Sequence, residues 1–221
     1  MPDRILNLTF HGIGDPPPGL ASRSWDLWLT REEFAETLDA VSGRPEIRLT
    51  FDDSCRSDVE IVFPELKRRA LVGTFFVVVG RLDKPDYVTA EEVRTLAQEG
   101  MVIGSHGWQH RPWRRLTTAD VDEELVRSRA VLEDLTGTVV DEAACPFGVY
   151  DRRTVQGLRA AGYRHAFTSD GGWAHPTQWM QARNTLARGT GSDAARKLAA
   201  GELPEPPSLV QPLKNIVKRW R

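Results

Sequence analysis

Two adjacent carboxylates in this 221-residue sequence have the chemistry of a reactive centre. Asp52 and Asp53 directly follow Leu49-Thr50-Phe51, a run typical of a β-strand. Neighbouring carboxylates repel each other, so an enzyme keeps such a pair when a cation neutralises one and the other acts as a base. The alternative is a helix cap formed by the two aspartates with Ser54 and Ser57.

Two histidines four residues apart form the second group. His106 and His110 follow the run Ile103-Gly104-Ser105, and one helical turn would place both imidazoles on one face, within reach of one ion. Gly107 stands where the pattern H-E-x-x-H has its glutamate, so a base must come from elsewhere. One carboxylate and two histidines leave open positions for water and substrate on a metal ion. The alternative is a surface loop with no ligand.

The elements that must position these residues alternate along the chain. Short β-type runs are separated by segments of helical periodicity, which is typical of βα units around a parallel sheet. Both candidate groups follow predicted strands, and the carboxyl ends of parallel strands meet at one edge, where sites form. The predicted strands are Ile5–Phe10, Ile47–Phe51, Gly73–Val79, Met101–Ser105, Glu142–Cys145 and His165–Thr168.

Three helix starts share one signal. Thr30, Thr89 and Thr117 each precede a carboxylate by three residues, next to apolar residues, which predicts capping boxes. The third helix is expected to run to about Leu135 and to stop at Gly137. It is the longest helix that the pattern predicts.

The chain is expected to form one catalytic β/α domain over residues 1–202. The proline-rich stretch 203–207 then predicts a linker into a tail, 203–221, that is either unstructured, packed on the domain or a basic surface helix. The loop 15–19, with three prolines, does not mark a second domain.

Composition excludes several classes of protein. The net charge of −2 provides no field to attract nucleic acid, and two cysteines are too few for a disulfide scaffold. The first nine residues carry charges where a signal peptide is apolar, and no apolar run has membrane-spanning length. We therefore expect no nucleic-acid partner, no transmembrane segment and a cytoplasmic location.

Three motifs together resemble a known family. Thr50-Phe51-Asp52-Asp53, the pair His106 and His110, and Pro146-Phe147-Gly148 are similar to the first three motifs of the NodB-homology polysaccharide deacetylases, carbohydrate esterase family four. The segment 10–13, Phe-His-Gly-Ile, also resembles an opening found in one branch of that family. The resemblance runs from about 47 to 172. It implies a distorted, incomplete β/α barrel of about seven strands, with its site at the carboxyl ends of the strands.

The resemblance also implies roles for these residues. Asp52 would be the general base, and the backbone amide of Phe147 would bind the developing oxyanion. Asp53, His106 and His110 would hold a divalent metal, with zinc favoured and cobalt, iron or nickel as alternatives. The implied activity is removal of an acyl group, N-acetyl in preference to O-acyl, from a carbohydrate or amino sugar.

The later motifs depart from the family pattern. The arginine that pairs with the catalytic aspartate is replaced by Ala144, so either Arg183 substitutes for it or the pKa of Asp52 is less restrained. The fourth motif, D-x-x-D-W, is only echoed in 169–173, and the fifth, with its acid histidine, is not found. His11, after the first predicted strand, is the best placed alternative proton donor, against a structural histidine at the strand end.

Substrate contacts are predicted at Trp108, which lies between the two histidines, at Pro146 of the third motif, and at Arg183. Two rival functions stay open. The absence of the arginine and of the acid histidine favours a non-catalytic relative that binds carbohydrate in the same cleft. Two histidines and one carboxylate also suit an iron oxygenase, although the second aspartate and the βα pattern disfavour it.

Overall fold

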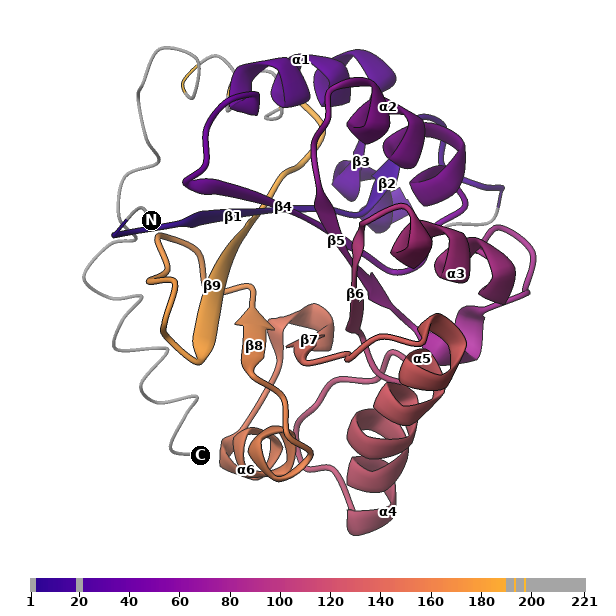
Figure 1. Ribbon diagram of the computed structural model, residues 1–221, viewed down its shortest axis with the longest axis vertical. Helices are drawn as coiled ribbons and strands as arrows, with labels where there is room; N and C mark the ends of the chain where they lie inside the picture. The colour runs from indigo at the N-terminus through magenta and orange to yellow at the C-terminus, as the bar shows by residue number, and fades with distance from the viewer. Residues whose placement is uncertain (1–2, 19–21, 190–192, 194–196, 198–221) are drawn as a thin grey trace.

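The chain forms a closed barrel of seven parallel strands. The computed structural model describes residues 3–18, 22–189, 193 and 197, and the predicted tail 203–221 lies outside this part of the chain. The strand order is β1-β4-β5-β6-β7-β8-β9, with helices around the outside (Figure 1). The predicted (β/α) barrel of about seven strands is confirmed. It is incomplete in having one strand fewer than an eight-stranded barrel, but pairing of β9 with β1 closes the ring.

The barrel strands are β1 (Leu6–Phe10), β4 (Ile47–Asp52), β5 (Gly73–Val77), β6 (Val102–Ser105), β7 (Glu142–Ala144), β8 (His165–Thr168) and β9 (Met180–Thr185). Two short strands, β2 (Gly12–Ile13) and β3 (Trp28–Leu29), pair outside the barrel. The helices are α1 (Arg31–Val41), α2 (Phe63–Arg68), α3 (Ala90–Gln98), α4 (Thr118–Val121), α5 (Ser128–Thr136) and α6 (Arg152–Ala160). Among the described residues, no helix combines the length and apolar character needed to cross a membrane.

The capping boxes at the three helix starts are confirmed. The side chains of Thr30, Thr89 and Thr117 each accept a hydrogen bond from the backbone amide three residues on, and the carboxylate there accepts one from the backbone amide of the threonine. The third helix runs from α4 through a π-helical turn, η4 (Asp122–Arg127), into α5, and ends at Gly137 with φ of +68°. The sequence did not predict the π-helical turn, in which an extra residue widens the helix.

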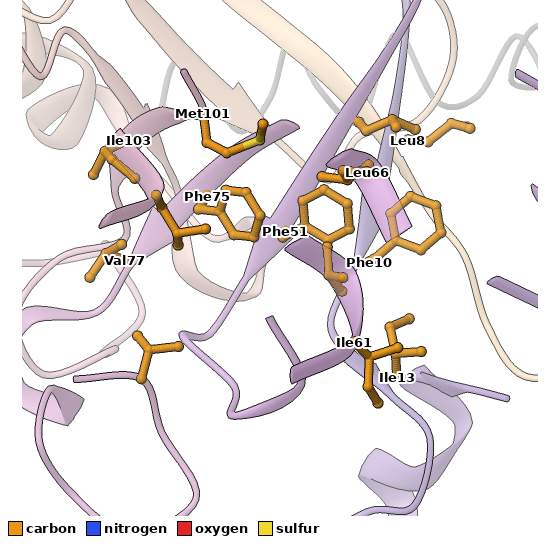
Figure 2. Close-up of a cluster of buried hydrophobic side chains, with 14 of the residues drawn as sticks. Leu8, Phe10, Ile13, Phe51, Ile61, Leu66, Phe75, Val77, Met101 and Ile103 are labelled. Atoms are coloured by element: carbon orange, nitrogen blue, oxygen red, sulfur yellow. The ribbon is translucent and has the colours of Figure 1, made fainter. Parts of the chain in front are cut away.

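Successive side chains along each strand point alternately outward, into the apolar core, and inward, into the barrel interior. Phe10, Phe51 and Phe75 point outward from three adjacent strands and stack side by side, with ring centroids 5.2 and 4.9 Å apart (Figure 2). Helix residues such as Phe34 and Leu66 belong to the same buried cluster. The main core therefore lies between the strands and helices α1 to α3.

Polar side chains fill part of the barrel interior. Thr9 and Thr50 share a hydrogen bond of 3.0 Å across β1 and β4, and Asn7 donates to the carbonyl of Ala182 at 2.8 Å. Gln181 and Arg183 of β9 are 0% and 1% exposed. Because polar residues occupy the buried face of β9, that strand lacks the short apolar run that identified the other six, and it was not predicted.

Candidate active site

Asp52 and Asp53 lie at the carboxyl end of β4, where the chain turns sharply. Asp53 and Ser54 have φ values of +80° and +60°, a conformation that non-glycine residues seldom adopt. The hydroxyl of Ser54 accepts a hydrogen bond from the amide of Val78 at 2.9 Å, which ties the turn to the end of β5. Strained backbone of this kind clusters at functional sites.

Asp53, His106 and His110 converge on one point. One potential ligand atom from each lies within 4.8 Å of the other two. Oδ1 of Asp53 is 2.9 Å from Nε2 of His110 and 3.9 Å from Nε2 of His106. That oxygen is buried, yet it has no well-aligned hydrogen bond among the described residues. One carboxylate and two imidazoles gathered at one point form a donor set that fits a divalent cation.

The hydrogen bond of His106 prepares it to bind a metal. Nδ1 lies 2.8 Å from the carbonyl oxygen of Ala144, and a carbonyl only accepts, so Nδ1 carries the proton and Nε2 is left with a free lone pair. Burial lowers the pKa of His106 to about 4, although the nearby charges of Asp52 and Asp53 oppose the shift. His106 is therefore neutral near pH 7, as a metal ligand must be.

The segment from His106 to His110 is a loop, not the helical turn that the four-residue spacing predicted. His110 has φ of +54°, and the two imidazole rings still approach to 4.9 Å between centroids. The predicted helical turn was wrong because residues outside the segment hold its backbone. The spacing of the two histidines therefore does not determine the backbone conformation between them.

Asp52 is paired with Arg183 deep in the barrel. The guanidinium donates to both carboxylate oxygens, at 2.6 and 2.7 Å, in the two-pronged geometry that gives the strongest such pairs. Burial alone would raise the pKa of Asp52, but the charge and hydrogen bonds of Arg183, with His106 and His11 nearby, hold it below its ordinary value. Asp52 is therefore ionised near pH 7. Arg183 occupies the position expected of a substitute for the missing arginine.

Arg81 is a cation that the sequence analysis missed. Its guanidinium lies 3.0 Å from Oδ1 of Asp53 and 3.2 Å from Nδ1 of His110, and it stacks over the ring of Tyr87. Burial opposes ionisation of Asp53, but His110, His11 and Arg81 outweigh it and hold the pKa of Asp53 well below its ordinary value. The predicted strand ended at Val79, two residues beyond β5, and Arg81 follows in the short helical turn Val79–Arg81, where no motif marks it.

A cavity of about 590 Å³ opens above this cluster. Asp52, Asp53, His106 and His110 form part of its lining, and the other lining residues include His11, Trp28, Tyr87, Phe147, Ser169 and Thr185. The structure thus brings the predicted base, the predicted metal ligands, His11 and Phe147 into one space. This volume is within the range of small-molecule sites.

The three predicted substrate contacts lie outside the described lining of this cavity. Arg183 is 1% exposed, and its guanidinium contacts Asp52, the predicted base. Pro146 is buried. Trp108 packs against the main core and under the guanidinium of Arg127. Packing of their side chains takes these residues away from the cavity.

His11 and Phe147 both line the cavity. Nδ1 of His11, directly after β1, is buried and makes no hydrogen bond among the described residues. Phe147 lies in a tight turn with φ of +56°, 64% exposed, and its ring is 4.5 Å from that of His110. The hydrogen bonds inside this turn are donated by the amides of Gly148 and Val149. In the segment that echoes the fourth motif, Asp170 accepts a hydrogen bond from the hydroxyl of Tyr150 at 2.8 Å.

The fold and the cluster together define a candidate hydrolytic centre at the carboxyl ends of the strands of a (β/α) barrel. A family model described as polysaccharide deacetylase matches residues 40–166. The chain therefore belongs to the polysaccharide deacetylase family, as the motifs predicted.

Individual relatives show how far the similarity extends. The chain is 25% identical to the YxkH protein of Bacillus subtilis over 66% of this chain, and 30% identical to the peptidoglycan-N-acetylglucosamine deacetylase PgdA of Listeria monocytogenes over 50% of it. These matches cover 52% and 23% of the two relatives, so the chain spans about half or less of their length. The deacetylase PplD of Streptococcus pyogenes has the same fold, with a TM-score of 0.80 at 20% identity over 92% of this chain and all of that one.

Proposed function

We propose that this chain is a metal-dependent deacetylase that hydrolyses the N-acetyl group of an amino sugar within a carbohydrate substrate. The observation that carries the proposal is the arrangement of Asp52, paired with Arg183, beside the ligand group Asp53, His106 and His110. The relatives named as deacetylases of peptidoglycan N-acetylglucosamine support the substrate class.

The residues of the chain divide the reaction between them. A divalent metal, for which zinc is favoured, would polarise the acyl carbonyl and acidify a water molecule when bound to Asp53, His106 and His110. Asp52 takes the proton of the attacking water as the new C–O bond forms. The Phe147 amide donates a hydrogen bond to the oxygen on which negative charge develops. The C–N bond then breaks, and acetate and the free amine leave.

His11 supplies the proton that the leaving nitrogen needs. It lines the cavity, and its buried Nδ1 has no hydrogen-bond partner among the described residues. An imidazole can protonate an amine as the C–N bond breaks, which prevents departure of an unfavourable amide anion.

Replacing His11 by Asn should lower kcat for acetate release by about 10²-fold, the lower end of what a general acid contributes. KM and cobalt binding should change little, because the metal-ligand group is intact. The measurement is steady-state kinetics with a chitooligosaccharide. An unchanged kcat would show that His11 only fixes the end of β1.

One of the two observations that favoured the non-catalytic alternative no longer favours it. The missing arginine favoured it, but Arg183 pairs with Asp52. The discriminating experiment is acetate release from chitooligosaccharides and acetylated sugars after addition of zinc or cobalt. Release above the metal-free rate supports the enzyme. No release from any of them, by protein that binds the metal, supports the carbohydrate-binding relative. The cytoplasmic location and the 1–202 domain boundary stay predictions.

A further inference from the structure

Glu124 is a fully buried carboxylate placed against the loop that joins the two histidines. It lies in the π-helical turn η4 and is 0% exposed. One carboxylate oxygen accepts a hydrogen bond from the amide of Trp108 and the other from the amide of Gln109, both at 2.9 Å. Two consecutive amides midway between His106 and His110 are thus bound by one side chain. π-helical turns are frequent at functional sites.

Further contacts fix this carboxylate in place. The indole nitrogen of Trp113 donates to it at 3.3 Å, and Nε of Arg111 forms an ion pair with it at 3.1 Å. A buried carboxylate without partners would carry a large desolvation penalty. Here two backbone amides, an indole and a guanidinium surround the carboxylate, offset its desolvation and fix it against the loop.

The loop is held on its other side as well. The amide of Gly107 donates to the hydroxyl of Ser105 at 3.2 Å. The carbonyls of Gly107 and Trp108 accept from the amides of Val79 and Gly80, at 3.0 and 2.9 Å. Glu124 supplies the acceptors for the remaining amides of the loop centre. Without it, those amides would be buried without partners or the loop would have to move.

Gly107 leaves the space that Glu124 occupies. A Cβ at this position would lie 2.3 Å from a carboxylate oxygen of Glu124, and the φ of +82° is unfavourable for any other residue. The absence of a side chain at 107 therefore lets the carboxylate reach the loop backbone directly.

We propose that Glu124 is a positioning residue that holds His106 and His110 in ligating orientation and so sets the affinity of the site for its metal. The inference rests on the proposed function, because it requires that Asp53 and the two histidines bind a metal. Residues that orient metal ligands typically change metal affinity by about 10- to 100-fold when altered.

The test measures cobalt(II) binding by titration and by the visible absorption of the bound ion. In E124Q one acceptor becomes an amide donor, which faces a backbone N–H, so the dissociation constant should rise by about 10- to 100-fold and the absorption should shift. The matched control is E123Q. Glu123 lies on the same turn and also pairs with Arg111, at 3.7 Å, and E123Q should bind cobalt as the unaltered protein does.

Two further variants separate positioning from loss of stability. Leu132→Ala removes a buried apolar side chain of α5, so it destabilises the fold without removing a hydrogen bond of the loop and should leave cobalt affinity unchanged. If E124Q does not fold, Arg111→Gln removes the ion-pair partner, which is 38% exposed, and should weaken cobalt binding several-fold.

Unchanged affinity in folded E124Q, or in R111Q where E124Q does not fold, would overturn the inference. Equal weakening in E124Q and L132A would overturn it too, because a general loss of stability would then explain the effect. If the unaltered protein binds no cobalt, the proposed function itself fails.

Discussion

Asp52→Asn should reduce acetate release by about 10²- to 10⁴-fold, the range that general acid–base groups contribute. Asn retains the size of the side chain but cannot take a proton from the attacking water. The metal-ligand group Asp53, His106 and His110 is unaltered, so the cobalt content of the variant should equal that of the unaltered protein. The measurement is acetate release at saturating substrate, with metal content determined on the same sample.

Asp52→Asn also leaves the charge of Arg183 without its partner. Lower activity could then reflect a weakened fold, and the control is the double variant D52N/R183M. It removes both charges and should recover stability while it stays inactive. Activity near the original level in folded D52N would contradict a role for Asp52 as the base.

Arg183→Met should destabilise the protein by about 3–5 kcal/mol, the typical effect of removing one partner of a buried ion pair. Both partners are nearly fully buried, with side chains 1% and 4% exposed, so water cannot replace the two lost hydrogen bonds. The measurement is equilibrium unfolding in urea with a chelator present, so that metal binding does not contribute to the free energy.

The pH dependence of the stability lost in R183M distinguishes a charge effect of Arg183 from a packing effect. In the unaltered protein the pKa of Asp52 lies below its ordinary value, so the stabilisation is present above that ordinary value and is lost as the pH falls through the lower folded pKa. In R183M the isolated buried carboxyl has a raised pKa, and its penalty grows as the pH rises. The free-energy difference between the two proteins should therefore be smaller near pH 4 than at pH 7.

Recovery in the double variant D52N/R183M is the second check on the same pair. Neutral Asn does not require a cation, so most of the stability lost in R183M should return. A loss in R183M that is independent of pH and persists in the double variant would show that the guanidinium acts only by packing, for instance over the ring of Phe76.

Local sequence signals were sufficient for much of this structure. Thr30, Thr89 and Thr117 mark their helices because a capping box lies within four residues of chain. Six strands were found from short apolar runs. Asp52 and His106 were recognised because strand ends and motif spacing are also local properties.

Features set by contacts distant in sequence were predicted only as alternatives or not at all. β9 has polar residues on its buried face, so its pattern does not identify it as a strand, and the pairing of Arg183 with Asp52 spans 131 residues. The sequence analysis named Arg183 as a possible partner of Asp52, but only closure of the barrel brings these two residues together. The loop from His106 to His110 depends on Glu124, from a π-helical turn without a clear sequence signal. Trp108, a predicted substrate contact, packs against the main core, and that packing could not be predicted from its neighbours in the sequence.

The proposed function requires Asp53, His106 and His110 to hold one metal ion beside Asp52. The decisive measurement is an anomalous difference map at the zinc absorption edge, from crystals grown with zinc and acetate. We expect one strong peak at about 2.0–2.2 Å from a ligand atom of each of these three residues, with acetate in the cavity near the Phe147 amide. A map with no peak among these residues, or with zinc bound only elsewhere on the protein, would contradict it.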